Sequence, residues 1–288
     1  MSKFTTPTTI RPARSLRSLL TLACTIMLGL TACSDDDAPE AIKPTLPAPE
    51  GMNVRTISYV GAFTDCYDWT FSYNSGRMLN ATSVLHQAGS ESDNGLTTKF
   101  SLSYNDKGVS LKNTTKGVSF PTQLNSLFHI EKMTEGEDVY TFNYTDGLLS
   151  SWRKKVVKTS SMGGTTTMET KGEITYDTNG DLKKVVYTAE QGQQTIVLFT
   201  LSDKENICGL LPPFATKELG CAGFEYLYYA GLLGRPTAHL VERIEFVYPD
   251  DEEAGQTVTL SYNMKGGKVQ LCNFVTSNGQ PGTVLYTY

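Results

Sequence analysis

The sequence predicts an all-β protein, in which a large antiparallel meander curls into a barrel-like sheet and carries one inserted helix. Three features predict this class: a recurring strand-and-turn unit, alternation of apolar and polar residues along the strands, and one segment with helical periodicity. In the recurring unit, illustrated by Ile174–Leu182, an alternating strand ends at a tyrosine and leads into Asp, Asn and Gly. Alternation places successive side chains on opposite faces of a strand, and Asp, Asn and Gly suit a tight turn, so each unit is a β-hairpin. The tyrosine of the unit occurs at Tyr73, Tyr104, Tyr144, Tyr176 and Tyr262.

The spacing of these units predicts how the strands are arranged. The first four units are separated by 31, 40 and 32 residues, the length of a hairpin plus a longer connection. All tight turns are therefore expected at one end of the sheet, and the longer connections at the other. A meander of about fourteen short strands is too wide to stay flat and open, so it should curl or close. The longer connections are expected at Gln87–Gly95, Ser160–Thr165, Ala189–Gln193 and Thr276–Gly282.

Residues 1–32 have the features of a secretory signal peptide. Four basic residues and no acidic ones precede the apolar segment Leu19–Leu30, which is shorter than the ~20 residues needed to span a bilayer. Residues 30–33 (Leu, Thr, Ala and Cys) then resemble the lipobox of bacterial lipoproteins, which implies cleavage before Cys33 and acylation of that residue. Several acyl chains on one residue would anchor the protein stably to a membrane. An ordinary signal peptide that contains Cys33 is the alternative.

Residues 33–51 are expected to form an acidic, proline-rich tether, and residues 52–288 a single β-meander domain. The run Ser34–Asp37 resembles the acidic export tag that directs Bacteroides-type lipoproteins to the outer face of the outer membrane. A solvated spacer is the alternative for this run. The prolines that follow favour an extended conformation. The expected location is therefore the outer membrane, through a lipid anchor, with exposure at the cell surface.

The charge balance argues against nucleic acid as a partner. Removal of the predicted signal takes away four of the 25 basic residues and none of the 30 acidic ones, so the net charge becomes 21 − 30 = −9. An acidic chain without a basic cluster has no surface that attracts a polyanion or anionic lipid. Membrane association is therefore expected through the lipid anchor alone.

Residues 214–233 change from strand to helical periodicity. Phe224, Leu227 and Tyr228 fit one face of a helix. Prolines ahead of the segment and a glycine after it suit the entry and exit of a helix, whereas glycines weaken its first half. The helix is therefore expected over Ala222–Leu233.

Four cysteines remain in the predicted domain, an even number for an oxidising compartment. Cys208 and Cys221 bracket a short loop, and Cys66 and Cys272 lie near the domain ends, so these are the favoured disulfide pairs. Four free, buried thiols that behave as small apolar side chains are the alternative. No cysteine pair has zinc-site spacing and the three histidines are scattered, so no metal site or cofactor is predicted.

The two tryptophans are the candidate ligand-binding residues, because an indole ring can stack on a sugar ring or an apolar ligand. Trp69 shares its strand face with Tyr67 and Phe71, which favours a place in the core. Trp152 lies between a serine and an arginine and is the better candidate for exposure.

Over residues 52–288 the chain resembles a family of Bacteroides-type lipoproteins, described as a domain of unknown function with a porin-like fold. The resemblance rests on the lipobox, the acidic run, the hairpin series and the segments Gly231–Arg235 and His239–Leu240. The resemblance implies a curled antiparallel sheet and a location at the membrane. The family has no assigned catalytic residues that could be transferred to this sequence.

The sequence favours a non-catalytic lipoprotein that binds a glycan, a peptide or an envelope partner through the longer connections. It contains no Gly-x-Ser-x-Gly elbow, no histidine pair with metal spacing and no phosphate-binding glycine loop ahead of a helix. A structural or assembly component of an envelope complex is one alternative, and a hydrolase is another. A membrane-spanning barrel is disfavoured, because Asp68, Thr70 and Ser72 occupy a strand face where such a barrel needs an apolar band.

Overall fold

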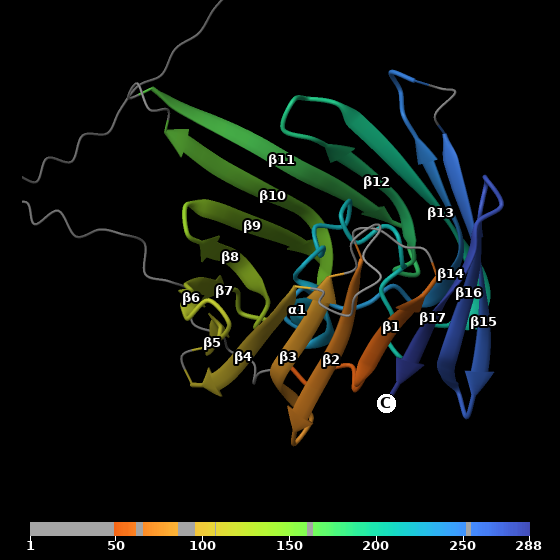
Figure 1. Ribbon diagram of the computed structural model, residues 1–288, viewed down its shortest axis with the longest axis horizontal. Coiled ribbons are helices and arrows are strands. Elements are labelled where there is room, and N and C mark those ends of the chain that lie inside the picture. Colours follow the sequence, from red (N-terminus) through yellow and green to blue (C-terminus); the bar gives the residue numbers. More distant parts are fainter. Residues whose placement is uncertain (1–48, 62–65, 86–95, 107, 160–163, 252–254) are drawn as a thin grey trace, which may run out of the picture. The chain divides into compact units, whose positions relative to one another are not determined.

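In the part of the chain that the structure describes, seventeen strands form a single antiparallel sheet (Figure 1). The computed structural model describes residues 49–61, 66–85, 96–106, 108–159, 164–251 and 255–288. The predicted signal peptide, Cys33 and most of the predicted tether lie outside the described residues. The strands are β1 (Thr56–Val60), β2 (Tyr67–Asn74), β3 (Arg77–Leu85), β4 (Thr97–Asn105), β5 (Gly108–Asn113), β6 (Val118–Phe120), β7 (Thr122–Leu124), β8 (Ile130–Glu135), β9 (Asp138–Thr145), β10 (Leu148–Thr159), β11 (Thr165–Tyr176), β12 (Leu182–Thr188), β13 (Gln194–Glu205), β14 (His239–Val247), β15 (Gln256–Lys265), β16 (Lys268–Thr276) and β17 (Pro281–Thr287).

The sheet closes into a barrel because its last strand pairs with its first. β17 is antiparallel to β1, which also pairs with β2 on its other side. β6 and β7 are two halves of one strand, interrupted at Pro121, which has no N–H to donate. β6 pairs with β5 and β7 pairs with β8. If β6 and β7 are taken as one strand, the ring has an even number of strands. A closed sheet needs an even number if all neighbouring strands are antiparallel.

Hydrogen bonds bridge the interruption at Pro121. The Thr122 hydroxyl donates to the carbonyl of Val109 on β5 (3.1 Å), and the Thr134 amide on β8 donates to the Pro121 carbonyl (3.0 Å). The ring is therefore held together where regular pairing fails. The predicted all-β, antiparallel, barrel-like sheet with one inserted helix is confirmed.

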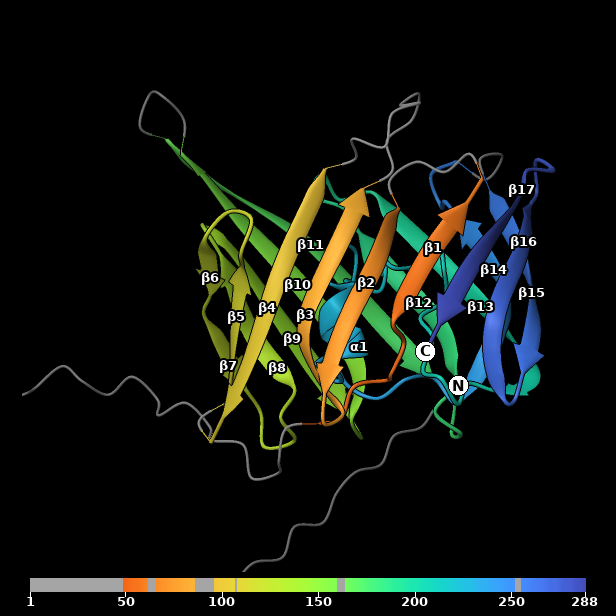
Figure 2. The ribbon, with the colours of Figure 1, turned by 60° about the horizontal axis from the view of Figure 1, so that its bottom comes forward.

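The five tight turns of the recurring units lie at one end of the barrel, as predicted, but not all tight turns do: the two-residue turn at Gly136–Glu137, between β8 and β9, lies at the other end. The five recurring turns follow β2, β4, β9, β11 and β15, which all run in the same direction because neighbouring strands are antiparallel. We call this the turn end, at the bottom of Figure 2, and the opposite end the loop end. The connections at Ala189–Gln193 and Thr276–Gly282 are at the loop end. Gln87–Gly95 and most of Ser160–Thr165 fall outside the described residues.

The recurring tyrosine has a structural role at the turn end. The hydroxyls of Tyr144, Tyr176 and Tyr262 donate to backbone carbonyls of Ile130 (2.7 Å), Leu149 (3.1 Å) and Val241 (2.6 Å). Each ring packs against the core while its hydroxyl satisfies a carbonyl on another strand or at a strand end. A phenylalanine would fill the same space but leave the carbonyl without this donor, which accounts for tyrosine at these three positions. The buried hydroxyls of Tyr73 and Tyr104 have no hydrogen-bond partner among the described residues.

Strand alternation separates an apolar interior from a polar exterior. On β2, Trp69 and Phe71 are buried whereas Thr70 and Ser72 are exposed. The same pattern recurs on β4, with Phe100 and Leu102 inside, and on β15, with Val258 and Leu260 inside. The core of the protein is therefore the inside of the barrel.

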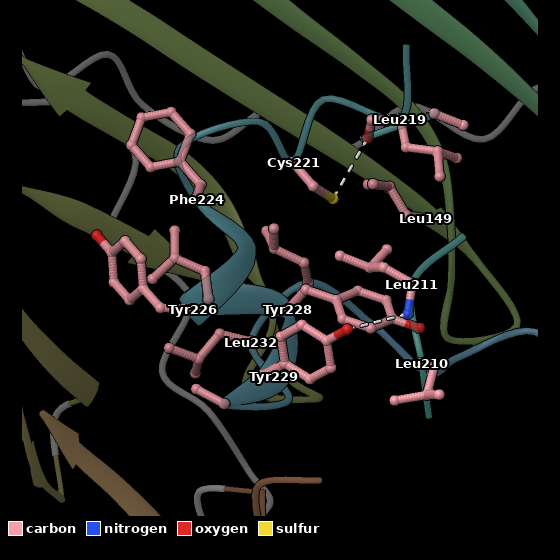
Figure 3. Close-up of a cluster of buried hydrophobic side chains, with 14 of the residues drawn as sticks. Leu149, Leu210, Leu211, Leu219, Cys221, Phe224, Tyr226, Tyr228, Tyr229 and Leu232 are labelled. Atoms are coloured by element: carbon pink, nitrogen blue, oxygen red, sulfur yellow. Dashed lines mark hydrogen bonds between the residues drawn. The ribbon is translucent and has the colours of Figure 1, made fainter. Parts of the chain in front are cut away.

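The connection between β13 and β14 fills this interior. We call residues 206–238 the plug; it enters and leaves at the turn end, and it holds the helix α1 (Glu225–Tyr229) inside the ring of strands (Figure 1). Tyr226, Leu227 and Leu232 of the plug are fully buried. Figure 3 shows plug side chains packed together and against Leu149 of β10, with the Tyr229 hydroxyl accepting from the Leu211 amide (3.2 Å).

The helix is much shorter than predicted. The sequence predicts Ala222–Leu233, but only Glu225–Tyr229 is helical, and the flanking residues form turns. Gly223 and Gly231 have positive φ angles of 78° and 77°, and this left-handed conformation ends a helix on either side. Among the described residues, no helix is long and apolar enough to cross a bilayer.

Candidate functional site

A cavity of about 520 Å³ lies at the loop end, between the plug and the barrel wall. We call it the mouth pocket. The wall contributes the end of β1, the start of β2 and the end of β3, and the plug contributes its deepest turns. Its principal lining residues are Tyr59, Tyr67 and Leu85 from the wall and Phe214, Glu218 and Glu225 from the plug.

Two buried carboxyl groups distinguish the mouth pocket. Glu225, the first residue of α1, is 7% exposed, and Glu218 is 8% exposed. In each, the Oε2 atom is buried and has no hydrogen-bond partner among the described residues. Buried polar atoms are almost always hydrogen-bonded, because an unpaired one costs roughly 1–3 kcal/mol. The Glu225 carboxyl nevertheless has donors close to it, namely the Trp69 indole N–H and the backbone amide of Gly223.

Burial controls the protonation of these carboxyls. It raises the pKa of Glu225 to about 8, so this group is largely neutral at pH 7 in the empty pocket. Burial also raises the pKa of Glu218, and the nearby Lys217 ammonium opposes that shift. The unfolded chain ionises Glu225 near its ordinary value of 4.5. The stability contributed by the neutral carboxyl is therefore complete below that pH and is lost as the pH rises to about 8.

A second, more open groove of about 980 Å³ lies at the turn end. Glu50, Arg77 and Tyr104 are among its lining residues, and the Arg77 guanidinium carbon lies 5.9 Å from the centroid of the Tyr104 ring. The described chain begins beside it. The Gly51 amide donates to the Gly76 carbonyl (2.8 Å), which attaches the end of the tether to the first tight turn. The chain therefore enters the barrel at the turn end, opposite the mouth pocket.

An aspartate and a histidine pair where the plug leaves the barrel interior. Asp181, in the turn between β11 and β12, accepts from the His239 amide (2.8 Å) and lies 2.7 Å from His239 Nδ1. The Thr237 hydroxyl donates to the same carboxylate (3.4 Å). These contacts join the turn to Thr237, near the end of the plug, and to His239, the residue that directly follows the plug. The pair therefore acts as a clamp that holds the end of the plug at the barrel wall.

Both tryptophans are buried, and the expected exposure of Trp152 is wrong. Trp69 is 2% exposed and stacks on Phe71, with ring centroids 5.7 Å apart. Trp152 is 6% exposed, and its indole N–H donates to the Glu218 carbonyl (2.8 Å). Gly172 of β11 pairs with Trp152 and leaves room for the ring. The polar neighbours of Trp152 in the sequence face outward, whereas its own side chain faces the plug.

Neither favoured disulfide is formed in the structure. None of Cys66, Cys208, Cys221 and Cys272 is part of a disulfide, and all but Cys66 are buried. The Cys221 thiol contacts the Leu219 carbonyl inside the plug (3.6 Å), whereas Cys272 lies on the inner face of β16. These residues occupy separate parts of the core, which agrees with the alternative of small apolar side chains for the buried three.

The mouth pocket itself was not predicted from the sequence. A signal was present: Glu218 and Glu225 are the two acidic residues in the otherwise mainly apolar segment 206–238. An acidic residue in an apolar segment indicates a buried polar site. Among the described residues, no group of three or more His, Cys, Asp or Glu side chains is placed to hold a metal ion.

Comparisons with known proteins agree on the fold. No protein-family model matches the chain, and no curated protein matches it. A porin-like protein from Bacteroides uniformis is similar with a TM-score of 0.63 at 18% identity, over 83% of this chain and 98% of that chain. A porin-like protein from Bacteroides vulgatus has a TM-score of 0.52 at 10% identity, over 82% and 98% of the two chains. The chain therefore has the fold of these porin-like barrels, and the likeness extends to the fold alone.

Proposed function

We propose that this protein is a lipid-anchored, non-catalytic barrel of the outer membrane surface that binds its target through the loop end. The target is a glycan, a peptide or an envelope partner. The observation that carries the proposal is the mouth pocket, which lies at the loop end and is lined in part by two buried glutamates. The tether joins the barrel at the opposite end, where Gly51 is bonded to Gly76. An anchor at Cys33 would then leave the loop end free to face away from the membrane.

The exterior of the barrel supports attachment by lipid rather than by membrane-spanning strands. A spanning barrel needs an apolar band about 25 Å tall on its outward face. Here exposed apolar side chains such as Leu198, Val275 and Leu285 alternate along the outer faces of their strands with polar ones, namely Thr200, Asn273 and Thr287. Water is a better solvent than lipid for such a surface.

One observation favours the alternative of an assembly component. Val186, Ile196 and Val247 are directly paired across β12, β13 and β14, and they form an outward apolar row. The exposed Leu198 continues this row along β13. A partner protein in an envelope complex could cover a row of this kind.

The proposal is tested by comparing changes at the two ends of the barrel. Shortening the loop-end connections Ala189–Gln193 and Thr276–Gly282 should abolish glycan-array binding or co-purification of a partner from membranes. Alanine at the exposed turn-end residues Ser75 and Asn179 is the control and should leave both unchanged. If the turn-end variants lose binding while the loop-end variants keep it, recognition takes place at the turn end, and the proposal is contradicted. Loss only on changing Ile196 and Leu198 would favour the assembly role.

A further inference from the structure

The outward apolar row on β12, β13 and β14 is one half of a patch with an ordered charge pattern. In the row beside it, one position nearer the turn end, Lys184 of β12 and Glu245 of β14 are the direct neighbours of Leu198 on β13. The first row is apolar throughout, and the second consists of a cation, a leucine and an anion. We call the two rows together the wall patch; its residues are Val186, Ile196, Val247, Lys184, Leu198 and Glu245.

The charged groups of the wall patch are weakly paired within the chain. Among the described residues, Lys184 has no ion-pair partner. Glu245 lies 3.4 Å from Arg243 of the same strand, but both side chains are about half exposed, so this pair contributes little. Leu198, between the two charges, is 39% exposed. A partner that suits the wall patch must therefore bring an anion to Lys184, a cation to Glu245 and an apolar group to Leu198.

We propose that a second copy of this chain covers the wall patch, related to the first by a twofold axis that runs along β13. Rotation about this axis places β12 of one copy opposite β14 of the other, and β13 opposite β13. Lys184 then faces Glu245 of the second copy, and Glu245 faces Lys184 of the second copy. Leu198 and Ile196 each face the same residue of the other copy. The wall patch is therefore complementary to itself, as a contact between identical copies requires.

Polar side chains border this contact on both sides. On the outer faces of the next strands, Thr175 of β11 pairs with Lys184, and Thr257 of β15 pairs with Glu245. The same rotation places Thr175 opposite Thr257 of the second copy. A fully buried apolar centre with a polar rim is the usual composition of a protein interface. The two charges select the partner and its register more than they add affinity.

The direction of the axis agrees with the position of the tether. Rotation about β13 does not reverse the strand, so both copies keep their turn ends on the same side. Because the chain enters the barrel at the turn end, two copies tethered to one membrane can make this contact. An axis across the strands would reverse one copy. It would also set Lys184 opposite Val186 and Glu245 opposite Val247, which leaves both charges without partners.

The contact should be weak in dilute solution and populated at the membrane. The wall patch has six residues, whereas a standard stable interface has about 20–30 residues a side. Anchoring both copies to one membrane raises their effective concentration, so that a contact too weak for dilute solution forms there. This step rests on the lipid anchor of the proposed function, whereas the geometry of the wall patch does not depend on it.

A cysteine on the twofold axis tests the geometry directly. Leu198→Cys places the new thiol opposite the same thiol of the second copy, so a short bismaleimide that spans the ~10 Å between packed sheets should join them. The full-length protein in its own membranes is treated. Leu285→Cys is the control, because Leu285 is also 39% exposed but lies on β17, outside the wall patch. We expect the dimer to form about tenfold faster with Leu198→Cys than with the control.

Charge reversal separates a second copy from any other occupant. Lys184→Glu brings like charges together at two symmetric places and should slow the crosslinking of Leu198→Cys about tenfold. Adding Glu245→Lys restores opposite charges across the contact and should restore the rate. A different protein on the wall patch would not recover its fit after both reversals. Circular dichroism checks that each variant is folded.

Three results would overturn the proposal. They are a Leu198→Cys protein that crosslinks no faster than Leu285→Cys, a crosslink to a different protein, and a double reversal that does not recover the rate. In solution, Leu198→Cys combined with Cys33→Ala should give the same link between the two 198 positions at about millimolar concentration. If fractionation shows no lipid anchor while this link still forms in solution, the proposed function fails and the contact between copies stands.

Discussion

Replacing Trp152 with alanine is expected to lower the free energy of unfolding by about 3–5 kcal/mol, the usual cost of removing a large buried aromatic side chain. Trp152 joins the wall to the plug: it extends from β10 over Gly172, and its indole N–H donates to the Glu218 carbonyl (2.8 Å). A Cβ atom built on Gly220 of the plug would overlap the same ring. The ring therefore fits between two glycines, and its loss leaves a cavity on both sides. Urea unfolding followed by circular dichroism measures the effect.

Trp152→Phe separates packing from the hydrogen bond. It keeps an aromatic ring but leaves the Glu218 carbonyl without its donor, so a smaller loss of about 1–3 kcal/mol is expected. Val157→Ala, at an exposed position of the same strand, is the control and should change stability very little. A Trp152→Ala protein as stable as the control would show that the plug is not held through this ring.

Replacing Asp181 with alanine is expected to cost about 2–3 kcal/mol and to loosen the plug, because buried donors lose their common acceptor. The carboxylate accepts from Thr237 and from the amide of His239 while it pairs with the imidazole. His239 is partly exposed, so solvent screens part of the charge interaction. Amide hydrogen exchange should show faster exchange in residues 206–238 than in β2–β4.

Asp181→Asn is the matched variant for this prediction. The side-chain oxygen of the asparagine can still accept from the His239 amide, but the negative charge is lost. We therefore expect Asp181→Asn to lower the free energy of unfolding by about half as much as Asp181→Ala. Uniform acceleration of exchange across all strands in Asp181→Ala would contradict a local clamp, because it would indicate that the plug and the barrel open together.

Strand alternation made most of the barrel predictable from the sequence. The hairpins, the curled antiparallel sheet and the common end of the five recurring turns follow from a two-residue period and from turn residues, which are local properties. Pro121 also marks a real interruption, although its division of one strand into β6 and β7 depends on pairing with β5 and β8. Such pairing is a property of the closed ring.

The plug could not be predicted in the same way. A helix on the surface of a sheet has one apolar face, and the pattern around Phe224 and Tyr228 suggested such a helix. Inside a closed barrel a segment is buried on all sides, so periodicity contains no information about its path. The same enclosure explains why Trp152 is buried, although its polar neighbours in the sequence favour exposure. It also explains the burial of Glu225, which the local sequence does not show.

The most direct test of the account is whether Cys33 alone keeps the protein in the membrane. Cys33→Ala should move the protein into the soluble fraction, where sedimentation and circular dichroism without detergent should show a folded, β-rich monomer. Cys24→Ala, which changes a cysteine inside the predicted signal peptide, should leave the protein in the membrane. A Cys33→Ala protein that stays in the membrane, or that aggregates unless detergent is added, would contradict a lipid-anchored barrel with a water-facing exterior and would favour membrane-spanning strands.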